Sequence, residues 1–392
     1  MHFAFFSPPL IGHLQPLAVL AHELERRGHK ATFVQRSDAA QLVKRWSLAL
    51  APVPADVAGP GGTIRQMARR TDLLCRHAPD LLREIGADAI VSDQLEPGGG
   101  LVAERLGLPF ASIACALPVN REAGIPPPYV GWRYRAGPGR RRRNAGGWRV
   151  TDILMRPVGG VIERWCNHWG LAPRGRLEEC FSPLLQIAQA VPSIDFPREE
   201  LPPHFHHVGP LREPEEEVWD LPRGGPLVYC SLGTTERGGG ARLFHAVAGA
   251  CDDLGVSLVL AHAGRLSRAE IDALPGAPDV HDFVPQRAVL RGADAVVTNC
   301  GFNTVLDALA ADLPMVAMPL AFEQPAIAAR IEHAGVGKAL SARWPLRRRL
   351  RAALAAVLEP SELRARARLV GAELRGAGGV TRAADLVERA LR

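Results

Sequence analysis

The stretch FAFFSPPLIGHLQPLAVLAHELERRG, residues 3–28, changes character near its middle. Its first four residues are apolar and typical of a buried strand, whereas apolar residues recur at helical spacing from Leu17 until the chain reaches Gly28. Two adjacent prolines, a glycine and His13 lie between the two patterns. The stretch therefore predicts a strand, a turn that carries His13, and a helix, and such turns are where open α/β sheets meet their ligands.

The same plan returns in the second half of the chain. The strand-like segment PLVYCS, residues 226–231, precedes a glycine-rich loop, a helical pattern over 241–255 and a second apolar segment over 256–261. A closer pair of segments is ADAIVSD, residues 87–93, and ADAVVTN, residues 293–299, each of which precedes a loop and a helix. These repeated strand and helix units predict an α/β fold made of two doubly wound domains with parallel sheets.

A segment without apolar periodicity separates the two halves. Residues 207–226 are rich in proline, glycine and acidic residues, which is typical of a linker. We therefore expect an N-terminal domain over 1–209, a linker over 210–224, a C-terminal domain over 225–375 and a final helix over 376–392 that packs back on the first domain. The two sheets then face each other across a cleft, into which four turns open, at His13, Asp93, Ser231 and Asn299.

The composition argues against several classes of protein. Seven cysteines, scattered and without a C-x-x-C pair, predict neither a disulfide framework nor a zinc site, and they fit a reducing cytoplasm. The net charge of +6 comes from arginine, and without a clustered basic face no nucleic-acid partner is expected. The N-terminus lacks a signal-peptide pattern, and no apolar run approaches the roughly 20 residues of a spanning helix. We expect a cytoplasmic protein that at most lies on the inner face of the membrane.

One basic segment stands out within the first half. Residues 133–149, RYRAGPGRRRRNAGGWR, combine like charges with glycines and predict a mobile loop. One explanation of this composition is a solvated surface turn. The alternative is contact with acidic lipids through Arg140 to Arg143, because Trp132 and Trp148 flank these arginines as in an interfacial anchor. A further cluster contains His204, His206 and His207. No helix or strand is predicted there to fix these side chains, so no metal site is expected.

Residues 283–325, FVPQRAVLRGADAVVTNCGFNTVLDALAADLPMVAMPLAFEQP, resemble the donor-binding signature of the family 1 glycosyltransferases, which use two Rossmann-like domains in the GT-B arrangement. PLIGHLQP, residues 9–16, is similar to the turn that opens the same family, so the resemblance spans the chain. Within that family, residues 91–128 look most like the bacterial zeaxanthin glucosyltransferases. The resemblance implies transfer of a hexose from a nucleotide diphosphate sugar.

The resemblance assigns donor-binding roles to residues of the second half. By family position these residues are Ser231, Thr234, Phe283, Val284, Gln286, Asn299, Gly301, Asn303, Thr304, Asp307, Glu323 and Gln324. Phe283 stacks on uracil in this scheme, where most plant relatives present tryptophan, and Gln286 with Asp307 contacts the ribose. Residues 301–304 open a helix directly after a strand, so their backbone N–H groups suit a pyrophosphate.

Two further parts of the donor site follow from the resemblance. Ser231 and Thr234 resemble a second phosphate clamp, and Glu323 with Gln324 matches the residues that hold the transferred hexose. One position departs from the family pattern, because Asn299 stands where the family usually carries histidine. An amide can donate to a phosphate oxygen but brings no positive charge. We therefore expect leaving-group stabilisation to be weaker by about 1–2 kcal/mol, roughly a tenfold effect on rate.

His13 and Asp93 match the catalytic pair of the family. A histidine near its unperturbed pKa of about 6.5 can take a proton from an alcohol, and a carboxylate beside it orients the ring and stabilises the imidazolium. The implied reaction is a single displacement that inverts an α-linked donor to a β-glycoside. No metal, cofactor or covalent intermediate is expected.

Residues 115–134 are apolar, proline-stiffened and aromatic, and they lie in the half with which the family binds acceptors. The candidate acceptor-binding residues are Leu117, Pro118, Asn120, Pro127, Tyr129 and Trp132. We expect the partners to be UDP-glucose and a lipophilic alcohol, namely a hydroxylated carotenoid such as zeaxanthin, delivered from a membrane surface. The alternatives are a polyketide or macrolide acceptor with a UDP- or dTDP-sugar, a catalytically silent relative that binds a partner protein, and a UDP-sugar epimerase.

Overall fold

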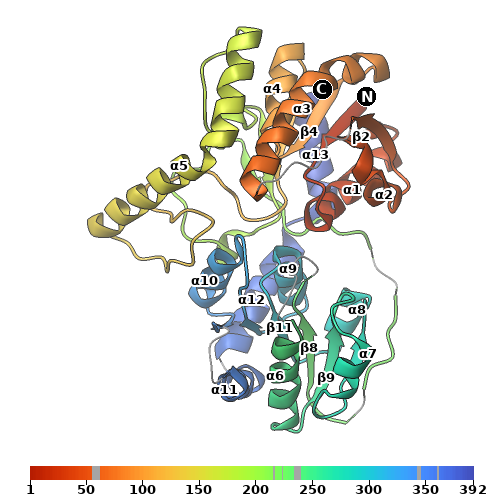
Figure 1. The fold of residues 1–392 in the computed structure, drawn as a ribbon, viewed down its shortest axis with the longest axis vertical. Coiled ribbons are helices and arrows are strands. Elements are labelled where there is room, and N and C mark those ends of the chain that lie inside the picture. Colours follow the sequence, from red (N-terminus) through yellow and green to blue (C-terminus); the bar gives the residue numbers. More distant parts are fainter. Residues whose placement is uncertain (55–61, 215–216, 223, 234–239, 342–345, 360–361) are drawn as a thin grey trace.

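The computed structural model describes residues 1–54, 62–214, 217–222, 224–233, 240–341, 346–359 and 362–392. These residues form two α/β domains, each built on a parallel sheet, and Figure 1 shows one domain above the other. The first sheet has the strand order β3-β2-β1-β4-β5-β6-β7 and the second has the order β10-β9-β8-β11-β12-β13. The predicted fold class, α/β with two doubly wound domains, is confirmed.

The strands have the following bounds. The first sheet contains β1 (His2–Phe6), β2 (Lys30–Arg36), β3 (Ala49–Val53), β4 (Ala89–Asp93), β5 (Phe110–Ala114), β6 (Leu185–Ala188) and β7 (Phe205–His207). The second sheet contains β8 (Leu227–Ser231), β9 (Ser257–Ala261), β10 (Asp279–His281), β11 (Ala295–Thr298), β12 (Met315–Ala317) and β13 (Gly337–Ala339).

The helices alternate with these strands along the chain. The first domain carries α1 (Ile11–Arg26), α2 (Ala40–Lys44), α3 (Thr63–Ile85), α4 (Pro97–Leu106) and α5 (Pro138–Trp169), with short 3-10 helices at Ser37–Ala39, Leu177–Cys180 and Pro192–Ile194. The second half of the chain carries α6 (Gly240–Asp252), α7 (Arg268–Asp272), α8 (Gln286–Leu290), α9 (Phe302–Ala310), α10 (Gln324–Ala334), α11 (Leu346–Leu358), α12 (Glu362–Gly376) and α13 (Gly379–Leu391).

Strand β1 explains why the first sheet is apolar throughout. Phe3, Ala4, Phe5 and Phe6 are all completely buried, because helices cover both faces of a doubly wound sheet. Phe3 and Phe5 pack with residues of α1 and α13, whereas Ala4 and Phe6 pack with residues of α3, α4 and α5. The continuous apolar strand ends at Phe6, and residues 7–10 lead into α1. The predicted turn is shorter than expected, because α1 begins at Ile11 and carries His13 in its first turn.

The last helix returns to the first domain. Helix α13 contacts α1, β5 and β6, and its Val380, Ala384 and Val387 join the core cluster that contains Phe3. Figure 1 accordingly shows the C-terminus beside the N-terminus in the upper domain. The two ends of the chain are thus held in one core, while the second sheet lies between them in sequence.

A buried ionic contact joins the two domains. Asp195, which follows the 3-10 helix after β6, accepts a hydrogen bond of 2.5 Å from Arg330 Nε of α10, and one of 2.8 Å from Arg198 Nε. The Arg330 guanidinium lies 4.2 Å from the centre of the Phe196 ring and is 2% exposed. Burial alone would raise the pKa of Asp195. The charges of Arg330 and Arg198 outweigh burial and hold this pKa well below its ordinary value. This contact fixes α10, and the loop before it, against the first domain.

The prediction of a mobile loop over residues 133–149 is wrong, because α5 begins at Pro138 and includes the arginine run. Trp148 is 6% exposed and donates a hydrogen bond of 3.0 Å to the Ile125 carbonyl, so it anchors the helix rather than flanking an exposed loop. The glycines and like charges disfavour a helix locally, but the buried side chains of Trp148 and Asn144, which donate to the carbonyls of Ile125 and Gly124, hold this part of the helix against residues 124–125. Among the described residues, no helix is both long and apolar enough to cross a membrane.

Candidate active site

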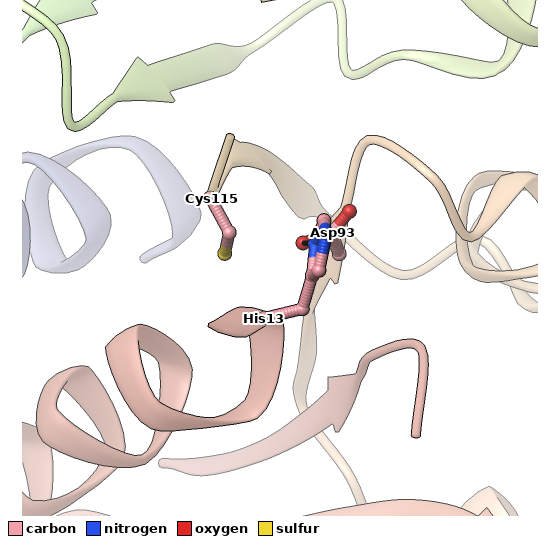
Figure 2. Close-up of side chains that lie close together, drawn as sticks. All are labelled: His13, Asp93 and Cys115. Carbon is pink, nitrogen blue, oxygen red and sulfur yellow. Dashed lines mark hydrogen bonds and ion pairs between the residues drawn. The ribbon is translucent and has the colours of Figure 1, made fainter. Parts of the chain in front are cut away.

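His13 and Asp93 meet at the edge of the first sheet. β1 and β4 are neighbouring parallel strands, so the turn after β1 and the last residue of β4 emerge at the same edge. His13 lies in the first turn of α1, is 8% exposed, and its Nδ1 is 2.8 Å from Asp93 Oδ2. Figure 2 shows the two side chains pointing towards each other. The other carboxylate oxygen accepts the backbone N–H of Leu95 at 2.7 Å. Both oxygens of Asp93 are therefore engaged, and the orientation of the ring is fixed.

The electrostatics suit a base that works near neutral pH. Burial lowers the pKa of His13, but the charge of Asp93, its hydrogen bond and the charge of Glu323 outweigh this, and the net pKa is raised. With Nδ1–H donating to Asp93, the neutral ring presents the lone pair of Nε2 as an acceptor. The described residues provide no hydrogen bond to Nε2. The pair can accordingly take a proton from a hydroxyl group placed at that nitrogen.

Two more titratable groups surround this pair, and sequence reasoning missed both. The Sγ of Cys115 lies within 4.8 Å of the ligand atoms of His13 and Asp93, and Figure 2 shows it near them. Glu96, which is 1% exposed, forms an ion pair with Arg70 of α3. Burial, together with the charge of Asp93, raises the pKa of Glu96 to about 7 although Arg70 opposes the shift. Glu96 follows Asp93 by three residues on the same turn, and that spacing was the signal in the sequence.

The turn between β11 and α9 lies at the carboxyl-terminal edge of the second sheet, in the position that the turn between β1 and α1 has in the first sheet. β8 and β11 are neighbours, so Ser231 lies opposite Thr298 at the carboxyl ends of these strands. Asn299 is 4% exposed, and its Oδ1 accepts the N–H of Gly301 at 3.3 Å. Gly233 has a φ of +76°, and a Cβ there would lie 2.5 Å from Asn299 Nδ2, so glycine is required beside the amide. The predicted clamp residue Thr234 lies outside the described residues.

Four polar side chains below this turn are bonded to one another. Gln286 Nε2 donates to Asp307 Oδ2 at 2.8 Å, and Thr304 Oγ1 donates to Gln286 Oε1 at 3.0 Å. Arg212 Nε donates to the second oxygen of Asp307 at 2.7 Å. The structure thus brings together the two residues predicted to contact ribose and adds Arg212. Arg212 was missed because it lies in the proline-rich segment, where the sequence shows only a linker.

The two turns contact each other directly across the domains. Asn303 Nδ2, at the start of α9, donates to the carbonyl of Gly12 at 2.9 Å, and Gly12 immediately precedes His13. Gln189 Nε2 of the first domain lies 3.4 Å from Asn303 Oδ1. The N-terminus of α9 therefore lies directly beside the backbone that precedes His13.

The remaining predicted donor residues have different surroundings. Phe283 is 69% exposed, and Val284 beside it is half-buried. Glu323 is the N-cap residue of α10, and its charge acts on His13. Gln324 is 5% exposed, and its Oε1 accepts the backbone N–H groups of Leu320 and Ala321 at 2.8 and 2.9 Å. Gln324 thus shapes the loop and leaves only its amide NH2 group for a ligand.

The predicted acceptor residues are scattered in the structure. Leu117, Pro118 and Pro127 are buried, and Asn120 exchanges side-chain hydrogen bonds with Gln94 and Gln186. Trp132 lies under the guanidinium of Arg143, 4.7 Å from its ring centre. Only Tyr129 of this set lines a cavity of about 470 Å³. Other cavity residues come from α5 and from the segment before β6, and include Thr151, Ile153, Met155, Arg156 and Leu177.

Tyr129, which lines this cavity, has a shifted pKa. Desolvation of its hydroxyl, followed by the charges of Glu323 and Glu178, raises the pKa of Tyr129 to about 12. The charge of Glu323 also raises the pKa of His13, so Tyr129 and His13 both respond to this carboxylate.

Comparisons with known proteins agree with this geometry. The family described as UDP-glucoronosyl and UDP-glucosyl transferase matches residues 187–366. A zeaxanthin glucosyltransferase of Pseudescherichia vulneris is 42% identical over 100% of this chain and 98% of its own length, and one of Pantoea ananas is 39% identical over 100% and 96%. A solved calicheamicin glycosyltransferase superposes with a TM-score of 0.82 at 25% identity, covering 100% of this chain and 98% of that one.

Proposed function

The chain belongs to the UDP-glucoronosyl and UDP-glucosyl transferase family and is a glycosyltransferase, and from that premise we propose that it transfers glucose from UDP-glucose to a hydroxyl of a carotenoid such as zeaxanthin. The observation that carries the proposal is the His13–Asp93 pair, buried and 2.8 Å apart, beside the helix start that contacts Gly12 through Asn303. A base and an anion-binding helix end at one place suit displacement at a carbon that carries a phosphate leaving group.

The proposed chemistry uses one step. The acceptor hydroxyl gives its proton to His13 Nε2 while its oxygen forms a bond to the anomeric carbon. The bond between that carbon and the β-phosphate oxygen breaks, and UDP leaves with the electron pair. Asp93 stabilises the imidazolium that forms. Because attack and departure occur on opposite faces of the sugar, an α-linked donor gives a β-glucoside.

The donor occupies the second domain in this proposal. Phe283 and Val284 contact the uracil, and Gln286 with Asp307 contacts the ribose, so the hydrogen-bonded group around Arg212 opens to admit it. The backbone N–H groups and side chains of Gly301, Asn303 and Thr304 hold the pyrophosphate, together with Ser231, Thr234 and Asn299. Glu323 and the amide of Gln324 hold the glucose hydroxyls.

The acceptor enters from the side of α5. Tyr129, Ile153 and Leu177 give the cavity beside that helix an apolar wall, which suits the end of a long lipophilic alcohol. The names of the two similar relatives support a carotenoid as the acceptor. Such an acceptor dissolves in bilayers, so we place the enzyme in the cytoplasm, on the inner membrane face, with Arg140 to Arg143 near the lipid. No metal or other cofactor takes part.

Purified protein supplied with UDP-glucose and zeaxanthin in detergent micelles tests the proposal. We expect release of UDP and formation of a zeaxanthin β-glucoside, measured by liquid chromatography with mass spectrometry and by the anomeric coupling in NMR. A macrolide with UDP- or dTDP-sugars runs in parallel. Glucosylation of the macrolide alone would replace the carotenoid as acceptor, and an α-glucoside would contradict the single displacement. Absence of UDP release with every acceptor would favour a silent binding protein, and sugar epimerisation without acceptor would favour an epimerase.

A further inference from the structure

The outward face of α5 carries an apolar stripe. Val150, Ile153 and Leu154 are 56%, 55% and 58% exposed, and Pro157 is exposed as well. The spacing i, i+3, i+4 and i+7 places these four side chains on one face of the helix. Trp148 lies on the opposite face and is buried against Ile125. The apolar stripe is therefore directed away from the protein core.

A line of arginines runs beside the stripe. Arg142, Arg149 and Arg156 follow one another at seven-residue spacing, so they lie along one edge of the helix. All three are exposed, and within the described ranges none has an ion pair or a side-chain hydrogen bond. By contrast, Arg164 on the same helix pairs with Asp72 at 2.6 Å. Three positive charges next to an exposed apolar stripe are thus left without a partner inside the molecule.

The combination identifies the kind of surface that would cover this face. Figure 1 shows the N-terminal half of α5 standing out from the rest of the first domain, so the face is accessible. A second copy of the chain would bring the same line of arginines against itself, which is repulsive. A bilayer with acidic headgroups offers negative charge at its surface and hydrocarbon beneath, which matches both features of the helix.

The cavity described above adjoins this face. Ile153 and Arg156 belong to the outward face and also line the cavity. Tyr129 lines the same cavity from outside the helix. A helix lying on a membrane by this face would turn the cavity towards the lipid. An acceptor dissolved in the bilayer would then enter without crossing water.

We propose that the outward face of α5, formed by Arg142, Arg149, Val150, Ile153, Leu154 and Arg156 and here called the α5 docking face, binds an anionic lipid bilayer and directs the cavity towards it. The proposal deepens the proposed function, on which the purpose of docking rests, by naming the source of the acceptor. The binding itself needs neither substrate.

Sedimentation with large unilamellar vesicles tests the binding. Vesicles of phosphatidylcholine alone are compared with vesicles that contain one quarter phosphatidylglycerol, without UDP-glucose or acceptor. Wild type should bind the anionic vesicles and be released by 0.5 M NaCl. R142Q/R149Q should bind about 25-fold more weakly, since each arginine near an anionic surface contributes about a fivefold gain. V150S/L154S should lose about tenfold or more, because two apolar side chains no longer enter the lipid.

The control is R368Q/L369S on α12, which removes an exposed arginine and an exposed leucine elsewhere, and should bind as wild type does. Neither test variant changes a residue that lines the cavity, so turnover of zeaxanthin in detergent micelles should stay unchanged. With zeaxanthin in anionic vesicles, both should lose about tenfold. Unfolding temperatures confirm that the variants are folded.

Three outcomes would overturn the α5 docking face. Equal vesicle binding by wild type and both test variants would do so, as would loss of binding in the control to the same degree. Self-association of wild type that V150S/L154S abolishes, seen by light scattering without lipid, would assign the stripe to a dimer instead. Vesicle binding by wild type without glucosylation in either medium would refute the carotenoid acceptor and leave the docking face standing, so the two failures are distinguishable.

Discussion

The turn from β1 into α1 carries an imidazole bonded to a buried carboxylate, whereas the equivalent turn from β11 into α9 carries amides, a hydroxyl and the N–H groups of a helix start. Asp93 uses one oxygen for His13 and the other for the Leu95 N–H, so the first turn is complete before any substrate arrives. In the second turn, Gln286 and Asp307 satisfy each other, and Arg212 completes the group. If the first turn receives the acceptor and the second the donor, as proposed, the acceptor side is organised in advance, and the donor side has to exchange these hydrogen bonds for bonds to its ligand.

Removing the imidazole tests the first turn most severely. H13A should lower kcat by about 10³, because general base catalysis contributes 10²–10⁴ in rate. The Kd of UDP should stay within about twofold, since that ligand binds at the other turn. UDP release and glucoside formation are the measurements, and H245A, which changes an exposed histidine of α6, is the matched control. If H13A retains a tenth or more of wild-type kcat, His13 is not the base.

Removing only the charge beside the imidazole gives the next largest effect. D93N should lower kcat by roughly 10²–10³, because the ring loses its orientation and the imidazolium loses its stabilisation. Only the neutral ring accepts a proton, so wild-type activity should rise with pH through the raised pKa of His13. Without the Asp93 charge that pKa falls, and the acidic limb of the profile should move to lower pH. An unmoved limb would show that another group controls the rate.

Glu96 beneath the pair should affect stability more than rate. Its pKa is raised from 4.5 to about 7, so the folded protein holds this proton more tightly than the unfolded chain does. Stability is therefore lost as pH rises from the unfolded towards the folded pKa, and the loss is complete above it. E96Q removes that dependence, so its free energy of unfolding relative to wild type should increase by roughly 2–3 kcal/mol between pH 4 and pH 8. In E96Q, Arg70 loses its ionic partner, which lowers the free energy of unfolding by the same amount at both pH values. This loss therefore cancels from the difference between pH 4 and pH 8. Parallel urea curves at both values provide the measurement.

The second turn lacks the positive charge that the family usually places there, and restoring it tests what that absence costs. N299H should raise kcat about tenfold at a pH where the new imidazole is protonated, through a charge-assisted bond to the leaving phosphate. The gain should vanish at high pH, whereas N299A should lose activity at every pH. A ratio of N299H to wild-type kcat that does not change with pH would place the phosphate away from residue 299.

The strand pattern predicted the fold and the common edge at which His13 and Asp93 lie, whereas the resemblance to the family supplied their role as a pair. Apolar runs at β1, β4, β8 and β11 predict buried parallel strands, and residues that follow neighbouring strands must meet at one edge. His13 and Asp93 are such residues. The neighbours of this pair depend on contacts between distant segments, which periodicity does not contain. Arg70 reaches Glu96 from α3 in this way.

One interpretation failed and one residue was missed because local composition differs from tertiary environment. Arg212 lies in the predicted linker, and composition gave no sign that it binds Asp307 of the second domain. Residues 133–149 have the glycine and charge content of a loop, yet Trp148 anchors them as part of α5. In both cases a single long side chain that finds a buried partner decides the structure, and its partner is more than 20 residues away.

The smallest expected effect concerns the base-binding end of the second turn. Phe283 is 69% exposed, so a larger ring fits without disturbing the core, and stability should not change. F283W should tighten the Kd of UDP about threefold, since a larger aromatic face stacks better on uracil, whereas F283L should weaken it by a similar factor. Calorimetric titration with UDP measures both, and kcat should stay constant because the reacting atoms lie at the other end of the donor. Equal Kd values for all three proteins would remove Phe283 from the donor site and leave Gln286, Asp307 and the α9 start as the parts that distinguish this turn from the first.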